Sequence, residues 1–230
     1  MIAFFAGTPE DALAIARAFT SGTPEVDGPF HLHRGNWLGQ PAAVYLVTEG
    51  ADMAYAGARL AARRGAKAMV SVARAASASA EEAPLGSLVP AGAIWNLEGL
   101  LPMQRLLPDS AAELPLELDP LLPPRAVWTG REDMPGLGSA LLAVRAPLLL
   151  TELQSRRGIA LVDGWTSGLA EAAAEEEIPL RPHAFVDAAV VEGELVEAGE
   201  LLLARHRDAQ FAELMAVNTS PPRGTPLSSP

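Results

Sequence analysis

Short apolar segments of strand length alternate with helical patterns along most of this chain. The first segment, Ile2–Ala6, ends at Gly7, and Thr8 can then cap a helix that we expect over residues 10–19. A chain that repeats strand and helix in this order places its strands in parallel and covers both faces of the sheet with helices. The sequence therefore predicts an α/β fold, a three-layer α/β/α sandwich with a central mixed, mostly parallel sheet.

The remaining elements are predicted from apolar runs and from the Gly and Pro residues that end them. Strands are expected at 31–37 and 41–47, which form a hairpin, and at 68–73, 87–95, 126–129, 140–144, 159–162 and 180–186. Helices are expected at 51–64, 148–157, 167–177 and from about 195 or 200 to 217. Segments 75–84 and 96–124 are predicted as loops and 218–230 as a disordered Ser/Pro tail, so residues 1–217 form the single predicted domain.

Composition and charge exclude several classes of function. No apolar run reaches the roughly 18–20 residues of a membrane span, and the N-terminus lacks the basic start of a signal peptide. The chain has no cysteine, so disulfides and thiolate metal sites are excluded, and a cytoplasmic protein is expected. A net charge of −11 opposes binding to nucleic acid phosphates. We therefore expect neither a nucleic acid nor a membrane as partner.

No cofactor or metal site is predicted. His31 and His33 alternate on a strand and share a face, which permits metal binding, but no third ligand is apparent and a solvated hairpin face is the simpler interpretation. Segment 136–139, Gly-Leu-Gly-Ser, lacks the strand-to-helix context of a phosphate loop.

The order of these segments resembles the phosphorylase superfamily, which includes methylthioadenosine/S-adenosylhomocysteine nucleosidase, futalosine hydrolase and purine nucleoside phosphorylase. The similar parts are the first strand with its acidic turn, the helix that starts at Gly50, the strand at 66–72, and the segments 158–163 and 184–187. The resemblance covers residues 1–217. It implies a protein that binds a purine-type nucleoside or base, with phosphate as co-substrate in a phosphorylase, and that forms a homodimer.

Enzymes of this family need a carboxylic acid to protonate the leaving base, a carboxylate to hold the ribose hydroxyls, and a nucleophile, which is water with a Glu base or phosphate on a Gly-rich loop. Asp187 matches the acid. A carboxyl group that follows the buried apolar residues 184–186 is expected to have a raised pKa. The alternative is a capping or salt-bridged Asp at the end of a strand.

The ribose-binding carboxylate and the Gly-rich loop of the family are both altered in this chain. Where the family has Met-Glu this chain has Gly164-Trp165, so an indole replaces the ribose-binding carboxylate; it either stacks on a base or fills the emptied pocket. The family's Gly-rich substrate loop corresponds to Ala73, Arg74, Ala75, Ala76 and Ser77, whose Cβ atoms hinder close approach of a ligand to the backbone.

Charged residues near these segments complete the set of candidates. Arg74 is expected to hold an anion, to pair with Asp187, or to lie solvated on the surface. The water-activating Glu of the nucleosidases falls on Ala12, or on Asp11 with a one-residue shift, and both Asp11 and Glu10 are also ordinary acids for a first helical turn. His183 lies four residues before Asp187, as a rim or core residue.

Two hypotheses follow. In the first, the protein cleaves the N-glycosidic bond of a purine-type nucleoside, with Asp187 as the acid and Asp11 or Glu10 near the nucleophile. The predicted substrate-binding residues are Trp165, Arg74, Ala73, Ala76, Ser77, Gly50 and His183. In the second, the protein is a catalytically degenerate relative that binds a ligand or acts as a scaffold in a hetero-oligomer.

Overall fold

The computed structural model describes residues 1–48, 50–97, 126–128, 134–140 and 146–217. All twelve strands of these ranges join one sheet, in the order β2-β3-β4-β1-β5-β10-β9-β7-β8, with β11 paired to β5, β6 and β12. The strands are β1 (Ile2–Ala6), β2 (Thr20–Asp27), β3 (Phe30–Trp37), β4 (Gln40–Leu46), β5 (Ala68–Ser77), β6 (Leu88–Pro90), β7 (Ala93–Asn96), β8 (Ala126–Trp128), β9 (Gly136–Ser139), β10 (Ile159–Asp163), β11 (Leu180–Val191) and β12 (Glu194–Glu197).

The centre of the sheet is parallel and most of its margins are antiparallel. Strands β4, β1, β5 and β11 run parallel to their neighbours in this group, whereas β2, β3 and β4 form an antiparallel meander. Within the sheet β10 pairs antiparallel with the end of β5 and parallel with β9. The predicted mixed α/β sheet is confirmed.

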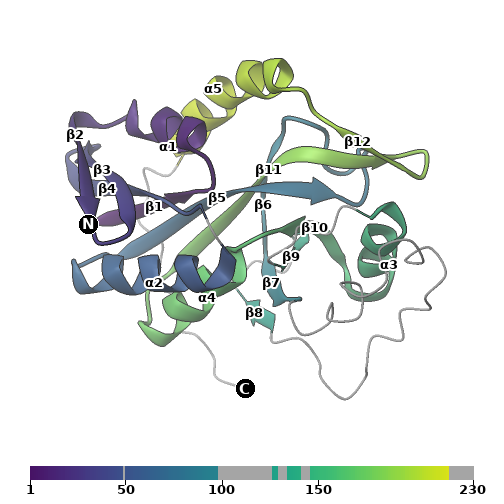
Figure 1. Ribbon diagram of the computed structural model, residues 1–230, viewed down its shortest axis with the longest axis horizontal. Helices are drawn as coiled ribbons and strands as arrows, with labels where there is room; N and C mark the ends of the chain where they lie inside the picture. Colours follow the sequence, from purple (N-terminus) through teal and green to yellow (C-terminus); the bar gives the residue numbers. More distant parts are fainter. Residues whose placement is uncertain (49, 98–125, 129–133, 141–145, 218–230) are drawn as a thin grey trace.

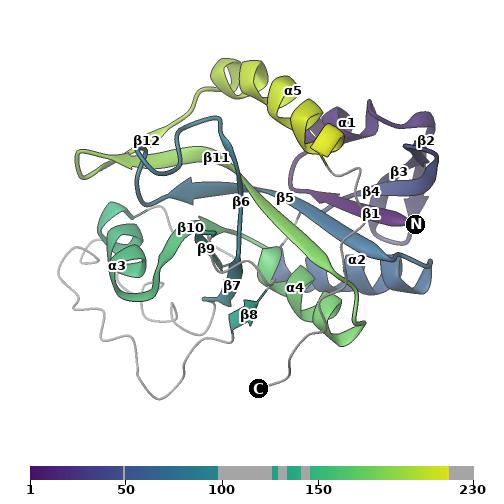
Figure 2. The ribbon, with the colours of Figure 1, turned by 180° about the vertical axis from the view of Figure 1, so that it is seen from behind.

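Helices cover both faces of the sheet (Figure 1). On one face lie α1 and α5, and on the other α2 and α4, while α3 packs on β10. The view from behind in Figure 2 shows α5 above the long strand β11. The helices are α1 (Pro9–Ala16), α2 (Gly50–Arg63), α3 (Pro147–Arg157), α4 (Thr166–Glu175) and α5 (Glu200–Val217).

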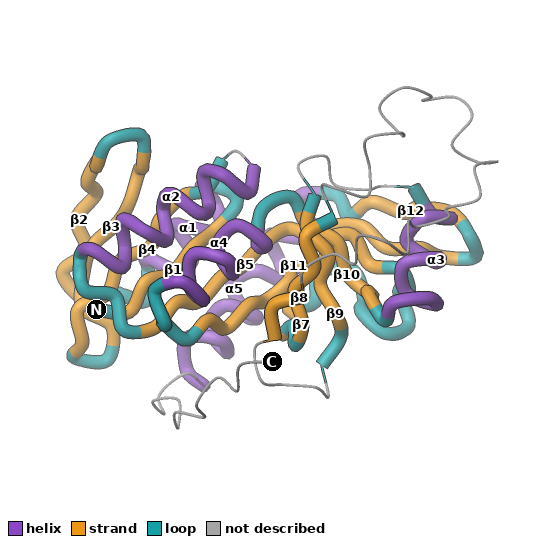
Figure 3. Tube along the Cα trace, turned by 90° about the horizontal axis from the view of Figure 1, so that it is seen from below, coloured by secondary structure: helices purple, strands orange, loops and turns teal. Residues whose placement is uncertain are grey.

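The two helices α2 and α4 lie side by side, as the view from below shows (Figure 3). A Cβ atom added at Gly168 would lie 1.9 Å from the Ala51 carbonyl oxygen, so only glycine permits this approach. Their shared face buries Ala54, Ala58 and Leu169 against the central strands. This contact fixes the N-termini of both helices beside each other, at the end of the sheet where β1 and β4 finish.

Local signals correctly predicted the start of α1 and the end of α3. Thr8 is the N-cap of α1 and accepts from the backbone N–H of Asp11, as predicted. Gly158 ends α3 in the left-handed conformation, with φ 67°. No helix among the described residues is long and apolar enough to cross a bilayer.

Several predicted boundaries were wrong. Helix α1 stops at Ala16, and the polar strand β2, which carries Pro24 and was not predicted, follows it. Residues 75–77, predicted as loop, continue β5, and β11 is followed by the unpredicted β12. The predicted strand 87–95 is divided at Ala91-Gly92 into β6 and β7. Strand β9, which was not predicted, lies just before the segment 140–144, and that expected strand falls almost wholly outside the described ranges, as do residues 98–124 and 218–230.

Candidate functional site

The predicted site residues gather where β1 and β4 end and β5 continues. Ala6, the last residue of β1, pairs with Val72, so β5 extends beyond β1 from Ala73 onward. The turn after β1 leads into α1, and the turn after β4 leads into α2. In open α/β sheets, ligands bind outside the carboxyl ends of parallel strands at such a point. The topology therefore places a candidate binding site here.

A buried ion cluster joins α1, β5 and α5 at this point. The Nε atom of Arg74 donates to Asp11 Oδ2 at 2.7 Å, and Nη2 donates to Oδ1 at 3.2 Å. Arg207 Nε lies 2.8 Å from the same Oδ1, and Arg207 Nη2 lies 3.6 Å from Glu200 Oε2. The side chain of Asp11 is 0% exposed, so two guanidinium groups share one carboxylate that has no contact with water.

Arg74 is held in its charged form. Burial opposes the charge and would lower its pKa, but the hydrogen bonds and charge of Asp11, with smaller effects of Glu200 and Asp187, raise the pKa above its ordinary value. Its guanidinium also lies over the ring of Phe185, 5.1 Å from the centroid. The prediction that Arg74 lies solvated on the surface is wrong. The direct partner of Arg74 is Asp11.

Asp187 lies at an irregularity of β11. Val186 pairs with Ala75 and Ala188 with Ala76, so Asp187 is the extra residue of a β-bulge. The side chain of Asp187 is half-buried. Bulges re-aim side chains and are common beside functional sites. Asp187 therefore lies where the regular pairing of β11 with β5 is interrupted.

Trp165 is a core residue. It is 7% exposed and belongs to the hydrophobic cluster that includes Ala73, Tyr45 and Leu169. A Cβ atom built on Gly7 would lie 3.0 Å from the indole Nε1 atom. Because neighbours on a strand point to opposite faces, Trp165 with Ala73 lies on the α2 and α4 side, and Arg74 lies on the α1 and α5 side. The candidate site is thus divided between the two faces of β5.

Asp163 anchors the start of α4. It accepts hydrogen bonds from the hydroxyls of Ser139 and Thr166 and from the backbone N–H groups of Trp165 at 3.2 Å and Thr166 at 3.3 Å. The Ser139 hydroxyl in turn accepts from the N–H of Ser167 at 3.0 Å. Burial raises the pKa of Asp163 to about 6, although these hydrogen bonds lower it. Asp163 therefore holds Trp165 in place through the backbone.

The pKa of Asp163 gives a pH-dependent prediction. Because the folded-state pKa of about 6 exceeds the ordinary 3.8, the folded state binds this proton more tightly than the unfolded state. The contribution of Asp163 to stability therefore falls as pH rises from about 4 to 6, by about 2–3 kcal/mol in total. We expect Asp163→Asn to remove this dependence in urea unfolding measured between pH 4 and 7. A difference between the two proteins that stays constant over this range would contradict the assignment.

Solved structures match this architecture, although no protein-family model matches the chain and no curated protein matches its sequence. Futalosine hydrolase of Helicobacter pylori is similar with TM-score 0.68 and 12% sequence identity, over 94% of this chain and 97% of that one. The 5′-methylthioadenosine/S-adenosylhomocysteine nucleosidase of Helicobacter pylori gives TM-score 0.68 and 13% identity, over 94% and 97%. The Colwellia psychrerythraea nucleosidase, solved in complex with adenine, gives 0.66 and 10% over 93% of each chain. The chain has the nucleosidase fold.

The other predicted residues lie on α1, α2, β5 and β11. Gly50 begins α2 with φ 47°, beside the start of α4. Ala76 and Ser77 lie inside β5, where β10 pairs on one side and β11 on the other. Glu10 is exposed on α1, and His183 is half-buried in β11 opposite Val72. Since β5 is still a strand at Ser77, its backbone amides face other strands and do not line an open loop.

Sequence reasoning missed two residues of this region. Arg207 lies in α5 on the same face as Leu203 and Phe211, which are buried core residues. A charged residue at an apolar position of a helix indicates a buried acidic partner, and this signal was available. Ser139 was set aside because its Gly-rich segment is no phosphate loop, but its hydroxyl links β9, Asp163 and α4.

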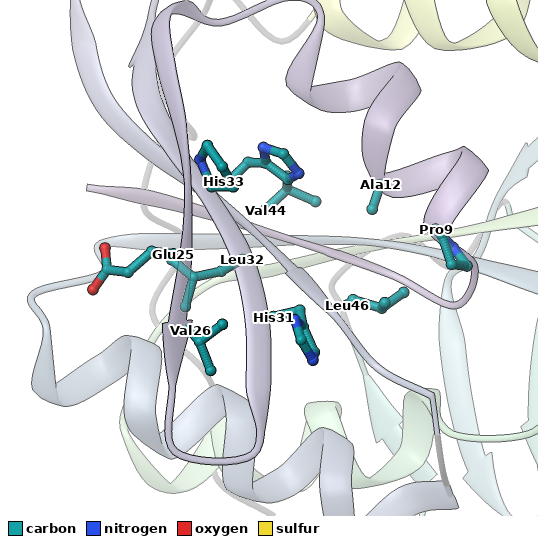
Figure 4. Close-up of a pocket in the computed structure, with 10 residues that line it drawn as sticks. Pro9, Ala12, Glu25, Val26, His31, Leu32, His33, Val44 and Leu46 are labelled. Atoms are coloured by element: carbon teal, nitrogen blue, oxygen red, sulfur yellow. The ribbon is translucent and has the colours of Figure 1, made fainter.

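The pair His31 and His33 lies away from these residues, in a pocket of about 270 Å³ between β2, β3, β4 and α1 (Figure 4). No group of three or more His, Asp or Glu side chains within the described ranges is arranged to hold a metal ion. The pocket reaches the carboxyl end of β4 at Leu46 and the start of α1 at Pro9, and its lining does not include Arg74, Trp165 or Asp187.

Proposed function

We propose that this protein binds a purine nucleoside or its free base at the carboxyl ends of β1, β4 and β5 without cleaving it. The observation that carries the proposal is the pairing of Asp11. Both oxygens of its buried carboxylate are held by guanidinium groups of Arg74 and Arg207. A general base must reach a water molecule and accept its proton. Asp11 meets neither condition.

The position of Trp165 supports the same proposal. The resemblance puts the ribose-binding carboxylate of the nucleosidases at Trp165, and here the indole is packed between Gly7 and the core. An indole carries only an N–H donor and has no oxygen to accept hydrogen bonds from ribose hydroxyls. Cleavage requires contacts that are stronger in the transition state than in the ground state, and the hold on those hydroxyls is one of them.

Asp187 supports the retention of a ligand. It is half-buried at a bulge, and its charge contributes to the field at Arg74. A carboxyl group in this setting recognises a ring nitrogen of a base by a hydrogen bond. Similar structures were solved with adenine and with nucleoside analogues. We infer that Asp187 binds the base.

The test combines binding and turnover. Thermal unfolding is measured with adenine, adenosine, inosine, methylthioadenosine, adenosylhomocysteine and futalosine, because a ligand of the native state raises the melting temperature. Base release is measured for each nucleoside, with and without phosphate. We expect a thermal shift with at least one member and no release of base. Asp187→Asn is expected to weaken that binding about tenfold, as the loss of one charge-assisted hydrogen bond implies.

Asp208→Asn is the matched control, because Asp208 is an exposed Asp on α5. It is expected to leave binding unchanged. The absence of any thermal shift with a folded protein would overturn the proposal. Release of base by the parent, reduced about 10²–10⁴-fold by Asp187→Asn, would support the first hypothesis, in which Asp187 is the general acid.

A further inference from the structure

Helix α1 only partly covers the sheet at the β2 edge. It has eight residues, from Pro9 to Ala16, and packs on β1, β4 and, to a smaller extent, β3. The same face of β2 therefore lies at the margin of the helix. Here Pro24, His33 and Val44 are cross-strand neighbours in one row, and Val26 pairs with His31 in the next. Cross-strand neighbours share a face of the sheet.

Together with the start of α1, these rows form the pocket of Figure 4. Pro9 and Ala12 on the helix lie across from Val44 and Leu46 on β4. The volume of about 270 Å³ lies just below the roughly 300–1,000 Å³ of pockets for drug-sized ligands, so the pocket suits a small molecule. Most of the lining is aliphatic, so water there makes few hydrogen bonds and is readily displaced by an apolar group.

The polar groups of the pocket are few. His31 and His33 provide imidazole nitrogens, which donate and accept hydrogen bonds. Glu25 is the one charged residue of the lining, and its carboxylate is paired with Arg34 at 3.0 Å and Arg64 at 3.5 Å. In Figure 4 its side chain points away from the others. No cation lines the pocket to balance an anionic ligand, and the chain carries a net charge of −11.

We propose that this pocket is a second ligand site, specific for a small uncharged aromatic heterocycle. Its ring packs on the aliphatic residues, and one or two ring heteroatoms hydrogen-bond to His31 and His33. An uncharged molecule suits the acidic chain better than a carboxylate does. The proposal does not depend on ligand binding at Asp187.

Histidine NMR tests the site directly, because the chain has four histidines, of which His31 and His33 line the pocket. His183 lies in β11 near Asp187, and His206 lies in α5. The imidazole signals, assigned with His→Gln variants, are recorded during titration with indole, benzimidazole, benzamide and benzoate. We expect the neutral probes to shift the His31 and His33 signals and benzoate to bind more weakly. Shifts of the His183 signal alone would report binding at the site proposed near Asp187. That result, or the absence of any shift, would overturn this inference.

Val26→Trp is the blocking variant, since Val26 is 64% exposed at the mouth of the pocket and can be enlarged without disturbing the core. We expect it to weaken probe binding at least about tenfold. Val196→Trp, at a 41% exposed position of β12, is the control and is expected to leave binding unchanged. His33→Leu keeps an apolar wall and is expected to weaken benzimidazole about fivefold through the lost hydrogen bond. Equal binding by all variants would show that the probes bind elsewhere.

Discussion

Asp11→Asn is expected to lower the free energy of unfolding by about 3–5 kcal/mol, because it leaves two buried guanidinium groups without their carboxylate. The side chains of Arg74 and Arg207 are only 14% and 10% exposed, so water cannot replace the lost partner. For a domain of this size the loss corresponds to a fall of roughly 10 °C in melting temperature. Urea and thermal unfolding at neutral pH measure it.

Glu10→Gln is the control for this experiment. Glu10 precedes Asp11 in the same helical turn and is exposed, so the variant is expected to change stability by less than about 0.5 kcal/mol. A catalytic carboxylate typically reduces the stability of a fold, and its removal is neutral or stabilising. Equal effects of the two variants would therefore contradict a buried structural cluster and restore Asp11 as a candidate base.

A second variant separates lost charge balance from lost packing. Replacing Asp11, Arg74 and Arg207 together by Leu, Met and Met removes the three buried charges and keeps a similar total volume of the three side chains. Buried ion clusters exchanged for apolar side chains are often as stable as the original. The triple variant is expected to be more stable than Asp11→Asn alone, although it carries more substitutions. If it is less stable, the cost of Asp11→Asn does not come from unpaired charge.

The fold was predictable because its determinants are local and repeated. Apolar runs such as Ile2–Ala6 and Ile159–Asp163, with a Thr cap or a left-handed Gly beside each helix, fix elements within a few residues. The elements that were missed have no such signal. Strand β2 is polar and mostly exposed, and it exists because its backbone pairs with β3. The composition of β2 does not show that its backbone pairs with the strand that follows it.

The sequence predicted which elements of the candidate site lie together, and the roles of its residues stay predictions. The resemblance brought Asp11, Arg74, Trp165 and Asp187 into one region, and the topology brings the elements that carry them together. Their partners depend on side chains that are far apart in sequence, such as Arg74 with Asp11 and Arg207 with Asp11. A strand places Ala73 and Arg74 on opposite faces, and sequence reasoning treated the segment as a loop. Because the segment is a strand and not a loop, the candidate site is divided between the two faces of β5.

Trp165→Ala is expected to lower the free energy of unfolding by about 3–5 kcal/mol, as large aromatic truncations in cores do. The indole is 7% exposed and packs with Ala73 and Leu169, so the truncation leaves a cavity beside Gly7. This loss is a large part of the roughly 5–15 kcal/mol that hold a domain folded. Trp165→Phe retains most of the apolar volume and is expected to cost about half as much. A ligand-stacking Trp on an open surface would show little loss in either variant.

Gly7→Ala tests whether the indole occupies the position beside β1. The added methyl group would lie 3.0 Å from Trp165 Nε1, so one of the two must move, and Gly7→Ala is expected to destabilise the parent by about 1–2 kcal/mol. In the Trp165→Ala background the same methyl group enters the cavity and is expected to cost nothing or to stabilise. The double-mutant cycle should therefore give a coupling of at least about 1 kcal/mol. Additive effects would show that Trp165 does not fill this position, and the argument against ribose binding there would lose its basis.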